Sequence, residues 1–434
     1  MTNNLPKIHI DNGRIVDPYL GIDELGSVWI ADGKILSLFE PPSDFTSDEI
    51  IDAEGLIVCP GFVDLSVRLR EPGHTHKGSI RSETQAALAA GVTSLCLPPD
   101  TKPCIDTPAV VEYIKDKAEQ AGYPNVYAIG SLTQRLDGSE LSAMFALKQA
   151  GCIAVSNASS PLASLLILRR AMEYAATHDL LLIYRANEPS LSGKGCAHEG
   201  AVASRYGLPG IPEAAESIAL AQALELAQLT GCRMHVSQIS CKQSVIKLQQ
   251  AKKYGLNVTA DVAAHQLHLT ESDMIPFDSR YHVLPPLRSH SDRQYLRNGL
   301  ANGTIDAICS DHQPHDLDAK LGAFPETEPG IAALESLLPL TLALAKQQGL
   351  SLSQALAGLT SKPAEILGLP AGALLAGRQA DVCVFDPEVN WQVNPDSWLS
   401  AGHNTPYWQK TLTGRVTHTI LNGRLAHQLS RKAL

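Results

Sequence analysis

The chain has 434 residues, of which 44% are hydrophobic and 18% charged, and its formal net charge is −10 at pH 7. This composition is typical of a folded globular protein and excludes a disordered chain. The acidic balance, without a block of like charges, gives no electrostatic signature of nucleic-acid binding or of attachment to an anionic membrane.

Nine cysteines are scattered along the sequence, and none forms a C-x-x-C pair. Most lie in apolar runs, where a thiol behaves as a small hydrophobic side chain. This pattern favours a reducing compartment over a disulfide framework or a cysteine zinc site. The first residues lack the apolar stretch of a secretory signal, and no run reaches the length of a membrane span. We therefore expect a cytoplasmic protein without membrane segments.

Both ends of the chain have the pattern of short strands and turns. Near the N-terminus, two apolar runs flank Asp11-Asn12-Gly13, and a third leads into Ala31-Asp32-Gly33. Near the C-terminus, residues 380–385 and 416–421 are strand candidates, and the latter precede Asn422-Gly423. Two β-rich ends around a different middle predict one small β domain. It would consist of residues 1–56 and 372–434.

The middle of the chain, residues 57–371, alternates short apolar runs with helical patterns. Eight strand–helix alternations predict an α/β protein with a (β/α)8 barrel. A doubly wound sheet is the alternative, but Pro60-Gly61-Phe62 is not the Gly-rich phosphate turn expected after its first strand. Residues 316–329 form a long irregular stretch that could cover the barrel mouth. The predicted strands are residues 56–58 with 62–65, 92–97, 126–129, 153–156, 180–184, 232–236, 258–262 and 307–309.

In such a barrel the functional residues follow the C-terminal ends of the strands. Residues 60–73, PGFVDLSVRLREPG, resemble the signature of dihydroorotases and related cyclic amidohydrolases, Pro-Gly-(aliphatic)-Asp-x-His-x-His-Leu-Arg-Glu-Pro-Gly. In that family the two histidines bind zinc, and here Ser66 and Arg68 replace them. Arg70, which in the family grips the substrate carboxylate, is retained. The segments that extend the resemblance are residues 258–265, 285–288, 303–315, 330–335 and 404–416.

The resemblance also places the other metal ligands of the family. The bridging carboxylate falls at Asn157, the strand-5 histidine at Arg185 and the strand-6 histidine at Gln238. Of the expected ligands, Asp311 alone is kept, the strand-8 carboxylate that in the family binds metal and shuttles a proton. Two further positions are implied as remnants of a substrate site. They are Asp100, in place of an asparagine, and His315.

These replacements predict that the zinc site is lost and that the protein needs no cofactor. A hydrolytic zinc ion is held by neutral imidazoles and anionic oxygens, which also lower the pKa of its bound water. The guanidinium groups of Arg68 and Arg185 have no lone pair to donate, and their charge repels a cation. We expect both arginines to fill the vacated volume and to compensate Asp311, together with Asp100.

Other arrangements of catalytic residues have less support. His74 and His76 could form a relocated ligand pair, but a solvated loop is the simpler interpretation. Ser66 is a nucleophile candidate by position, yet its neighbours are arginines, which are not bases at neutral pH, and no G-x-S-x-G turn is present. Arg70 could bind an anion or pair with Glu71.

The pattern of lost histidines resembles a class of inactive dihydroorotase homologues that associate with the catalytic chain of aspartate transcarbamoylase. The resemblance implies a non-catalytic subunit of a hetero-oligomer, or a homodimer when alone, that serves assembly in pyrimidine synthesis. Two alternatives remain open: an active or rewired cyclic amidohydrolase, and a sensor of an anionic pyrimidine intermediate that uses Arg70.

Overall fold

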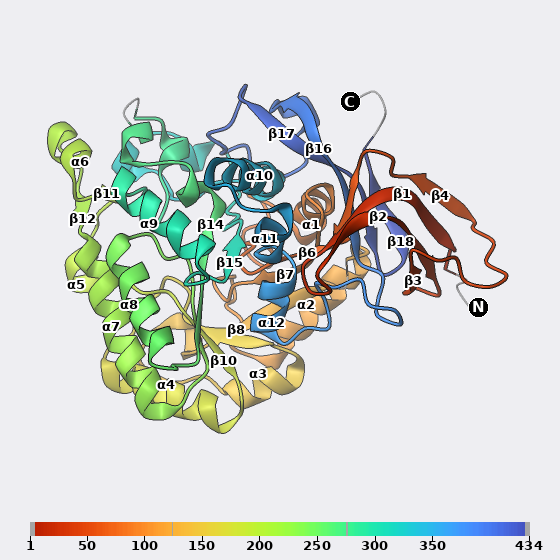
Figure 1. Cartoon of the computed structure of the whole chain (residues 1–434). Coiled ribbons are helices and arrows are strands. Elements are labelled where there is room, and N and C mark those ends of the chain that lie inside the picture. The colour runs from red at the N-terminus through yellow and green to blue at the C-terminus, as the bar shows by residue number, and fades with distance from the viewer. Residues whose placement is uncertain (1–4, 124, 275–276, 430–434) are drawn as a thin grey trace.

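The computed structural model describes residues 5–123, 125–274 and 277–429. It contains an eight-stranded parallel sheet that curves into a nearly closed barrel, and beside it an eight-stranded sheet built from both ends of the chain (Figure 1). This arrangement confirms the predicted fold.

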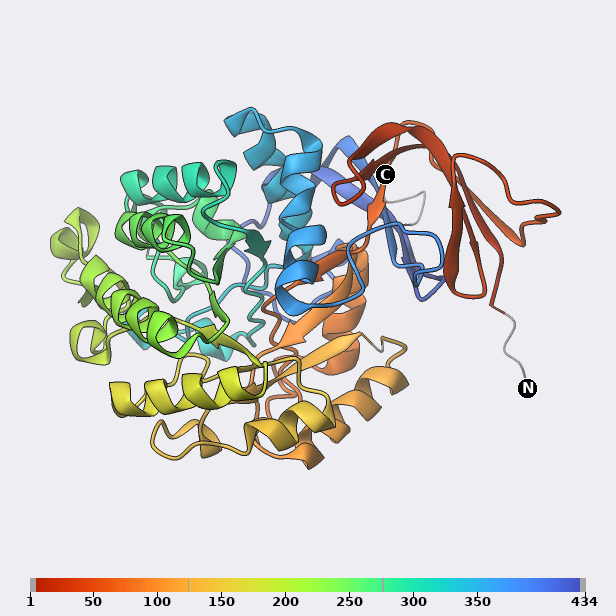
Figure 2. The same cartoon turned by 60° about the horizontal axis from the view of Figure 1, so that its bottom comes forward.

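Each barrel strand is followed by at least one helix, and the helices lie around the outside of the strands (Figure 2). The strands are β6 (Phe62–Asp64), β7 (Val92–Leu97), β8 (Val126–Ser131), β9 (Ala154–Ser156), β10 (Leu181–Tyr184), β13 (Met234–Val236), β14 (Val258–Ala263) and β15 (Ala307–Cys309). The helices are α1 (Ile80–Ala89), α2 (Pro108–Gln120), α3 (Met144–Ala150), α4 (Leu165–Thr177), α7 (Glu213–Thr230), α8 (Lys242–Lys253), α9 (His290–Ala301), α10 (Leu337–Gln348), α11 (Leu352–Ala357) and α12 (Ser361–Leu367).

The barrel strands are apolar on both faces because both faces are covered. On β10, Leu181 and Ile183 belong to an apolar cluster that α12 also joins, whereas Leu182 belongs to the larger cluster that includes residues of the outer helices. Successive side chains of a strand point to opposite faces, so continuous apolar runs are what a strand buried on both sides requires.

The barrel closes between the segments that follow its first and last strands. Val67, after β6, forms a parallel bridge with His312, after β15. The amide of Arg68 donates to the carbonyl of His312 (3.0 Å), and the amide of His312 donates to the carbonyl of Ser66 (3.1 Å). This seam brings two distant parts of the sequence together at the C-terminal ends of the strands.

The second sheet has its own apolar core and differs from the prediction in two places. The sheet continues to Pro60, past the boundary expected at residue 57, because β5 pairs with strands from both ends of the chain. Asp11-Asn12-Gly13 is a bulge within one long strand and not a turn. The strands are β1 (Ile8–Asp17), β2 (Ile22–Ala31), β3 (Lys34–Leu38), β4 (Glu49–Asp52), β5 (Ile57–Pro60), β16 (Val382–Gln392), β17 (Thr411–Leu421) and β18 (Arg424–Gln428).

An insertion that the sequence pattern did not predict separates β10 from α7. Its two strands contain two residues each and pair with one another, so they are too short to produce a hydrophobic period. The elements of the insertion are α5 (Pro189–Ser192), β11 (Ala197–His198), α6 (Ala201–Tyr206) and β12 (Gly210–Ile211).

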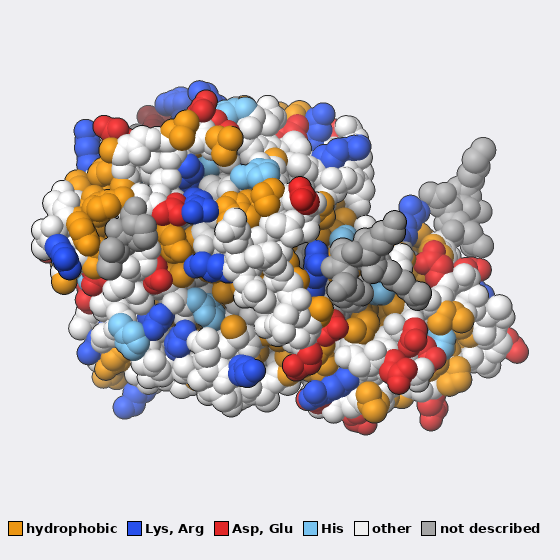
Figure 3. All heavy atoms as spheres, turned by 90° about the horizontal axis from the view of Figure 1, so that it is seen from above, with side chains coloured by type: hydrophobic (Ala, Val, Ile, Leu, Met, Phe, Trp, Pro, Cys, Tyr) orange, Lys and Arg blue, Asp and Glu red, His pale blue; other side chains and the backbone are white. Residues whose placement is uncertain are grey.

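The surface is consistent with the composition. On the face seen in Figure 3, acidic and basic side chains are interspersed over the barrel without a broad basic patch. All nine cysteines are free, and eight of them are buried. None of the helices in the described part of the chain is long and apolar enough to cross a membrane.

Residues 316–329, the expected cover of the mouth, are held against neighbouring loops. Lys77, in the loop after β6, donates to both carboxylate oxygens of Glu328 (2.5 and 2.6 Å). The buried ring of His282 contacts Thr327 Oγ1 through Nδ1 (2.9 Å) and lies 4.9 Å from the ring of Phe324. Burial, with the charge of Lys320, lowers the pKa of His282 to about 4.

We therefore predict that His282 makes the protein acid-sensitive. Below about pH 6.5, an unfolded chain protonates this histidine, whereas the folded chain does not until about pH 4, so its contribution to stability is lost over that window as the pH falls. Urea unfolding of the unmodified chain and of His282→Gln between pH 8 and 4 tests this. As the pH falls, the difference in unfolding free energy between the unmodified chain and His282→Gln should decrease with the slope that corresponds to about one extra proton bound by the unfolded chain. Parallel slopes would contradict the prediction. The comparison is needed because buried carboxyl groups such as Asp64, whose pKa burial raises to about 7, act in the opposite direction.

Candidate functional site

The centre of the barrel mouth is occupied by a guanidinium group. Arg68 donates from Nε to Asp100 Oδ2 (2.8 Å) and from Nη1 to Asp311 Oδ1 (3.2 Å). The side chains of Arg68 and Asp311 are only 8% and 2% exposed. Although burial alone would lower the pKa of Arg68, the two carboxylates raise it. Arg68 thus compensates both acids, as expected from the sequence.

Two other replaced positions also contact Asp311. Gln238 donates to Asp311 Oδ1 (2.8 Å) and to Ser66 Oγ (2.9 Å), and Ser66 Oγ donates to the same Asp311 oxygen (3.4 Å). Gln313 adds contacts to both carboxylate oxygens (3.1 Å each). Burial raises the pKa of Asp311, while the charges of Arg68 and Arg185 oppose that shift. The retained carboxylate is therefore surrounded by hydrogen-bond donors.

The last two replaced positions lie outside this network. Asn157 Oδ1 accepts from the amide and hydroxyl of Thr133 (3.3 and 2.8 Å). Arg185 donates to Ser159 Oγ, and no carboxylate in the described residues lies within 4.0 Å of it. Arg185 therefore compensates Asp311 through its charge alone, without a direct contact. The guanidinium of Arg185 instead contacts the hydroxyl of Ser159, in the loop after β9.

The residues expected to be remnants of a substrate site belong to two separate groups, Asp100 with Arg68 and His315 with Arg70. Asp100 is held by Arg68, as described, and the charge of Arg68 keeps the pKa of Asp100 low although burial opposes this. Arg70 donates from Nε to the carbonyl of Pro314 (2.8 Å) and contacts His315 Nε2 (3.1 Å). Burial and the charge of Arg70 lower the pKa of His315 to about 2, so this ring is neutral. Burial, with the charge of Arg68, lowers the pKa of Arg70 to about 10.

Glu71 and the histidine pair His74 and His76 lie in the loop that follows β6. Glu71 accepts from the amide of Ile80 and the hydroxyl of Tyr113 (3.0 Å each), so no pairing of Arg70 with Glu71 is seen. His74 is half-buried and His76 exposed, and their rings contact one another edge to face. Their position agrees with a loop in contact with solvent.

Sequence reasoning missed the buried acids that shape the strand ends. Asp64 accepts from the amides of Ser66 (3.2 Å) and Ser310 (3.1 Å). Asp261 accepts from the amide of Gln238 (2.7 Å) and contacts His235 Nε2 (2.9 Å). The sequence signal that could have identified Asp64 is its position two residues before Ser66, one of the replaced ligands. Asp261 had no local signal, because its partner lies on another strand.

Residues at this site do not fit a zinc ion. The guanidinium of Arg68 lies among the carboxylates, and Asp311 is already bound by donors. Gln238 Oε1 has no hydrogen-bond partner among the described residues. One neutral amide oxygen, next to a carboxylate whose oxygens already accept hydrogen bonds, is too weak a ligand set for a hydrolytic metal.

A second group of possible metal ligands lies between the insertion after β10 and the starts of α7 and α9. His198, Glu213 and Asp292 have ligand atoms within 4.8 Å of one another. Asp292, however, accepts from the amide of Lys242 (2.8 Å), and the guanidinium of Arg288 contacts His198 Nδ1 (3.2 Å). A neighbouring cation and occupied oxygens argue against a metal there.

Comparison with known proteins identifies the family. A family profile described as Dihydro-orotase-like matches residues 55–244. The "Dihydroorotase-like protein" of Pseudomonas aeruginosa is 46% identical over 421 residues, which cover 97% of this chain and 99% of that protein. The chain belongs to the dihydroorotase-like family. A protein named dihydroorotase from Syntrophotalea carbinolica is 43% identical over 98% of this chain and 100% of its own length.

A solved structure shows that the fold of this dihydroorotase-like chain is shared more widely. The L-hydantoinase (dihydropyrimidinase) from Arthrobacter aurescens superposes with a TM-score of 0.85 over 98% of each chain, at 23% sequence identity. This likeness concerns the barrel and the attached sheet, and it carries no information on the activity of the present chain.

The arrangement predicts that Arg68 is a major contributor to stability. Arg68→Met leaves two aspartates without their cation, and the loss of one partner of a buried pair typically costs about 3–5 kcal/mol. The unfolding free energy from urea titration measures this. The control is Arg14→Met, which removes an exposed pair with Asp23 and should cost less than about 1 kcal/mol. Recovery of part of the loss in the double variant Arg68→Met/Asp311→Asn would identify the pair as the cause. Equal stability of Arg68→Met and Arg14→Met would contradict it.

Proposed function

We propose that this dihydroorotase-like chain is a non-catalytic homologue in which the barrel serves as a structural subunit in pyrimidine synthesis. Its partner would be the catalytic chain of aspartate transcarbamoylase, in the cytoplasm. The observation that carries the proposal is the pairing of Arg68 with Asp311 and Asp100, at the place where the family's metal ions are expected.

The chemistry of the mouth supports the loss of hydrolysis. Hydrolysis of a cyclic amide at neutral pH needs an activated water and a group that moves its proton. Asp311 is the retained proton carrier, yet one of its oxygens accepts from Ser66, Arg68 and Gln238. Although burial raises the pKa of Asp311, these donors already occupy its oxygens in place of a water, and Arg68 repels a metal that could activate water.

The intact architecture supports a structural role. Three of the replaced residues, Arg68, Gln238 and Ser66, form a connected set of hydrogen bonds at the centre of the mouth. A barrel that keeps its packing after losing its metal ligands can still present a surface to a partner. The transcarbamoylase partner follows from the resemblance to inactive homologues, and two Pseudomonas relatives at 46% identity are also named dihydroorotase-like rather than dihydroorotase.

We predict that the purified chain has no dihydroorotase activity and retains no zinc. After incubation with zinc and gel filtration, the metal content measured by mass spectrometry should be far below one ion per chain, and cyclisation of carbamoyl aspartate should stay at the uncatalysed rate. The dihydroorotase from Syntrophotalea carbinolica, treated identically, is the comparison. Turnover that disappears in Asp311→Ala would instead establish a rewired amidohydrolase.

We also predict a stable complex with aspartate transcarbamoylase. Co-expression of the tagged chain with the transcarbamoylase catalytic chain of the same organism should give one hetero-oligomer in size-exclusion chromatography with light scattering. The chain alone should be a homodimer. Transcarbamoylase that assembles fully and has full activity without this chain would overturn the proposed role, whatever the outcome of the metal assay.

An anion sensor that uses Arg70 is a second candidate. The guanidinium of Arg70 contacts a carbonyl and a neutral imidazole, and no carboxylate in the described part of the chain lies within 4.0 Å of it. Such a cation can accept an anionic group. Its Nε and Nη2, however, are already engaged, which leaves less of the guanidinium available than the sequence suggested.

A further inference from the structure

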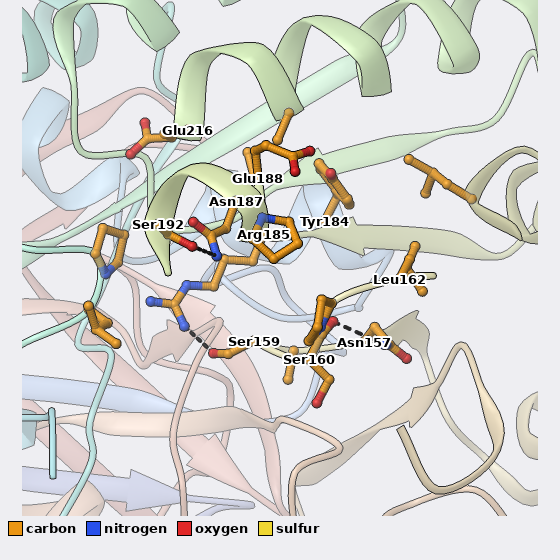
Figure 4. A pocket seen from close by; sticks show the side chains of 18 of the residues that line it. Asn157, Ser159, Ser160, Leu162, Tyr184, Arg185, Asn187, Glu188, Ser192 and Glu216 are labelled. Atoms are coloured by element: carbon orange, nitrogen blue, oxygen red, sulfur yellow. Dashed lines mark hydrogen bonds between the residues drawn. The ribbon is translucent and has the colours of Figure 1, made fainter. Parts of the chain in front are cut away.

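A cavity of about 420 Å³ lies beside the centre of the mouth, over the ends of β9 and β10 (Figure 4). The loops after these two strands form two of its walls, and the start of α7 and the segment 284–288 complete it. Its size falls in the lower part of the range of about 300–1,000 Å³ that is usual for small-molecule sites. Apolar side chains supply part of the lining, notably Leu132, Ile183, Ile211, Pro285 and Pro286.

Two arginines line this cavity, Arg185 and Arg288, and Arg185 is the one without a carboxylate in direct contact. In Figure 4 its guanidinium extends toward Ser159, away from the carboxylate of Glu188. Its hydrogen-bond partner is the hydroxyl of Ser159, which is neutral. Arg185 is half-buried, and burial lowers its pKa, as expected for a charge without a carboxylate in direct contact.

The acids in the cavity wall are bound to other groups. Glu188 accepts from the amide and hydroxyl of Ser190 (3.1 and 2.6 Å). Glu216 accepts from the amides of Ser240 (3.0 Å) and Cys241 (3.3 Å), and one of its oxygens lies 3.9 Å from Arg288. Neither carboxylate contacts Arg185 directly, although the charge of Glu216 acts on it through space.

The carboxylates at the centre of the mouth are also committed to another cation. Asp100 and Asp311 both pair with Arg68. A partly buried charge is costly unless a counter-ion or hydrogen bonds compensate it, so the half-buried guanidinium of Arg185, with a neutral hydroxyl as its contact, favours an incoming anion.

We propose that this cavity binds a small organic carboxylate, with its carboxylate group on Arg185 and its apolar body against Pro285 and Pro286. A guanidinium presents two parallel donors that match a carboxylate. A single guanidinium without a carboxylate in contact matches a monoanion, and Glu188 and Glu216 in the walls disfavour a dianion such as phosphate. The site is distinct from Arg70, and it does not require a transcarbamoylase partner.

The test uses benzoate as the probe, with benzyl alcohol as its neutral analogue and inorganic phosphate as a dianion. Benzoate should raise the melting temperature of the full chain and bind with one site per chain in calorimetry, because a ligand that binds the native state stabilises it. The other two compounds should have no such effect. Arg185→Met should weaken benzoate binding by about tenfold or more, equivalent to about 1.4 kcal/mol. Arg185→Lys, which keeps the charge without the fork, should weaken it less, and the distant Arg14→Met should not change it.

A second measurement locates the probe without any substitution. Crystals of the unmodified chain soaked in 4-iodobenzoate should show the iodine anomalous peak inside the cavity, with the carboxylate beside Arg185. This result decides the matter if Arg185→Met does not fold. The proposal is overturned if benzoate has no effect, if Arg185→Met binds it as well as the unmodified chain, or if the peak lies beside Arg70 and Arg70→Gln abolishes binding. None of these outcomes alters the tests of the structural role.

Discussion

Arg68 connects the segments after the first and last barrel strands through both its backbone and its side chain. Its amide bonds to the carbonyl of His312 across the seam between the first and last strands, and its guanidinium bonds to Asp311, the residue before His312. The backbone contact fixes where the side chain emerges, and the side chain then neutralises the acid beside the seam. Asp100, after β7, is drawn to the same group. The rest of the mouth is arranged around this one buried cation.

The neighbouring replacements follow from the presence of that cation. A metal centre needs lone pairs around a positive ion, whereas here an anion, Asp311, is surrounded by donors from Ser66, Gln238 and Gln313. Both arrangements compensate a buried carboxylate, but only the first can activate water. The exchange of acceptors for donors compensates Asp311 without a metal ion, which supports the proposed loss of hydrolysis.

The backbone of the site keeps a strained geometry. Arg70, Gln238 and Asp311 have φ angles of 64°, 55° and 47°, in the left-handed region, where each non-glycine residue costs about 1–2 kcal/mol. Buried acids help to hold this geometry, since Asp261 accepts from the amide of Gln238. Such strain persists where the surroundings determine the conformation, and it is common at functional sites. The strained positions thus lie at the strand ends that form the mouth, which supports the proposal that the cavity beside Arg185 binds a ligand.

The sequence by itself determined the barrel, because eight apolar runs of strand length alternate with helices and no Gly-rich phosphate turn follows the first of them. The family spacing at residues 60–73 and 303–315 also predicted that Arg68 and Asp311 would meet at the mouth. Only the tertiary structure decided where the side chains go. Arg68 and Arg185 are the same residue type at equivalent positions, yet one meets two carboxylates and the other a serine hydroxyl. Their partners lie on other strands and loops, and a side chain selects its partner by distance in the folded chain, which spacing along the sequence does not specify.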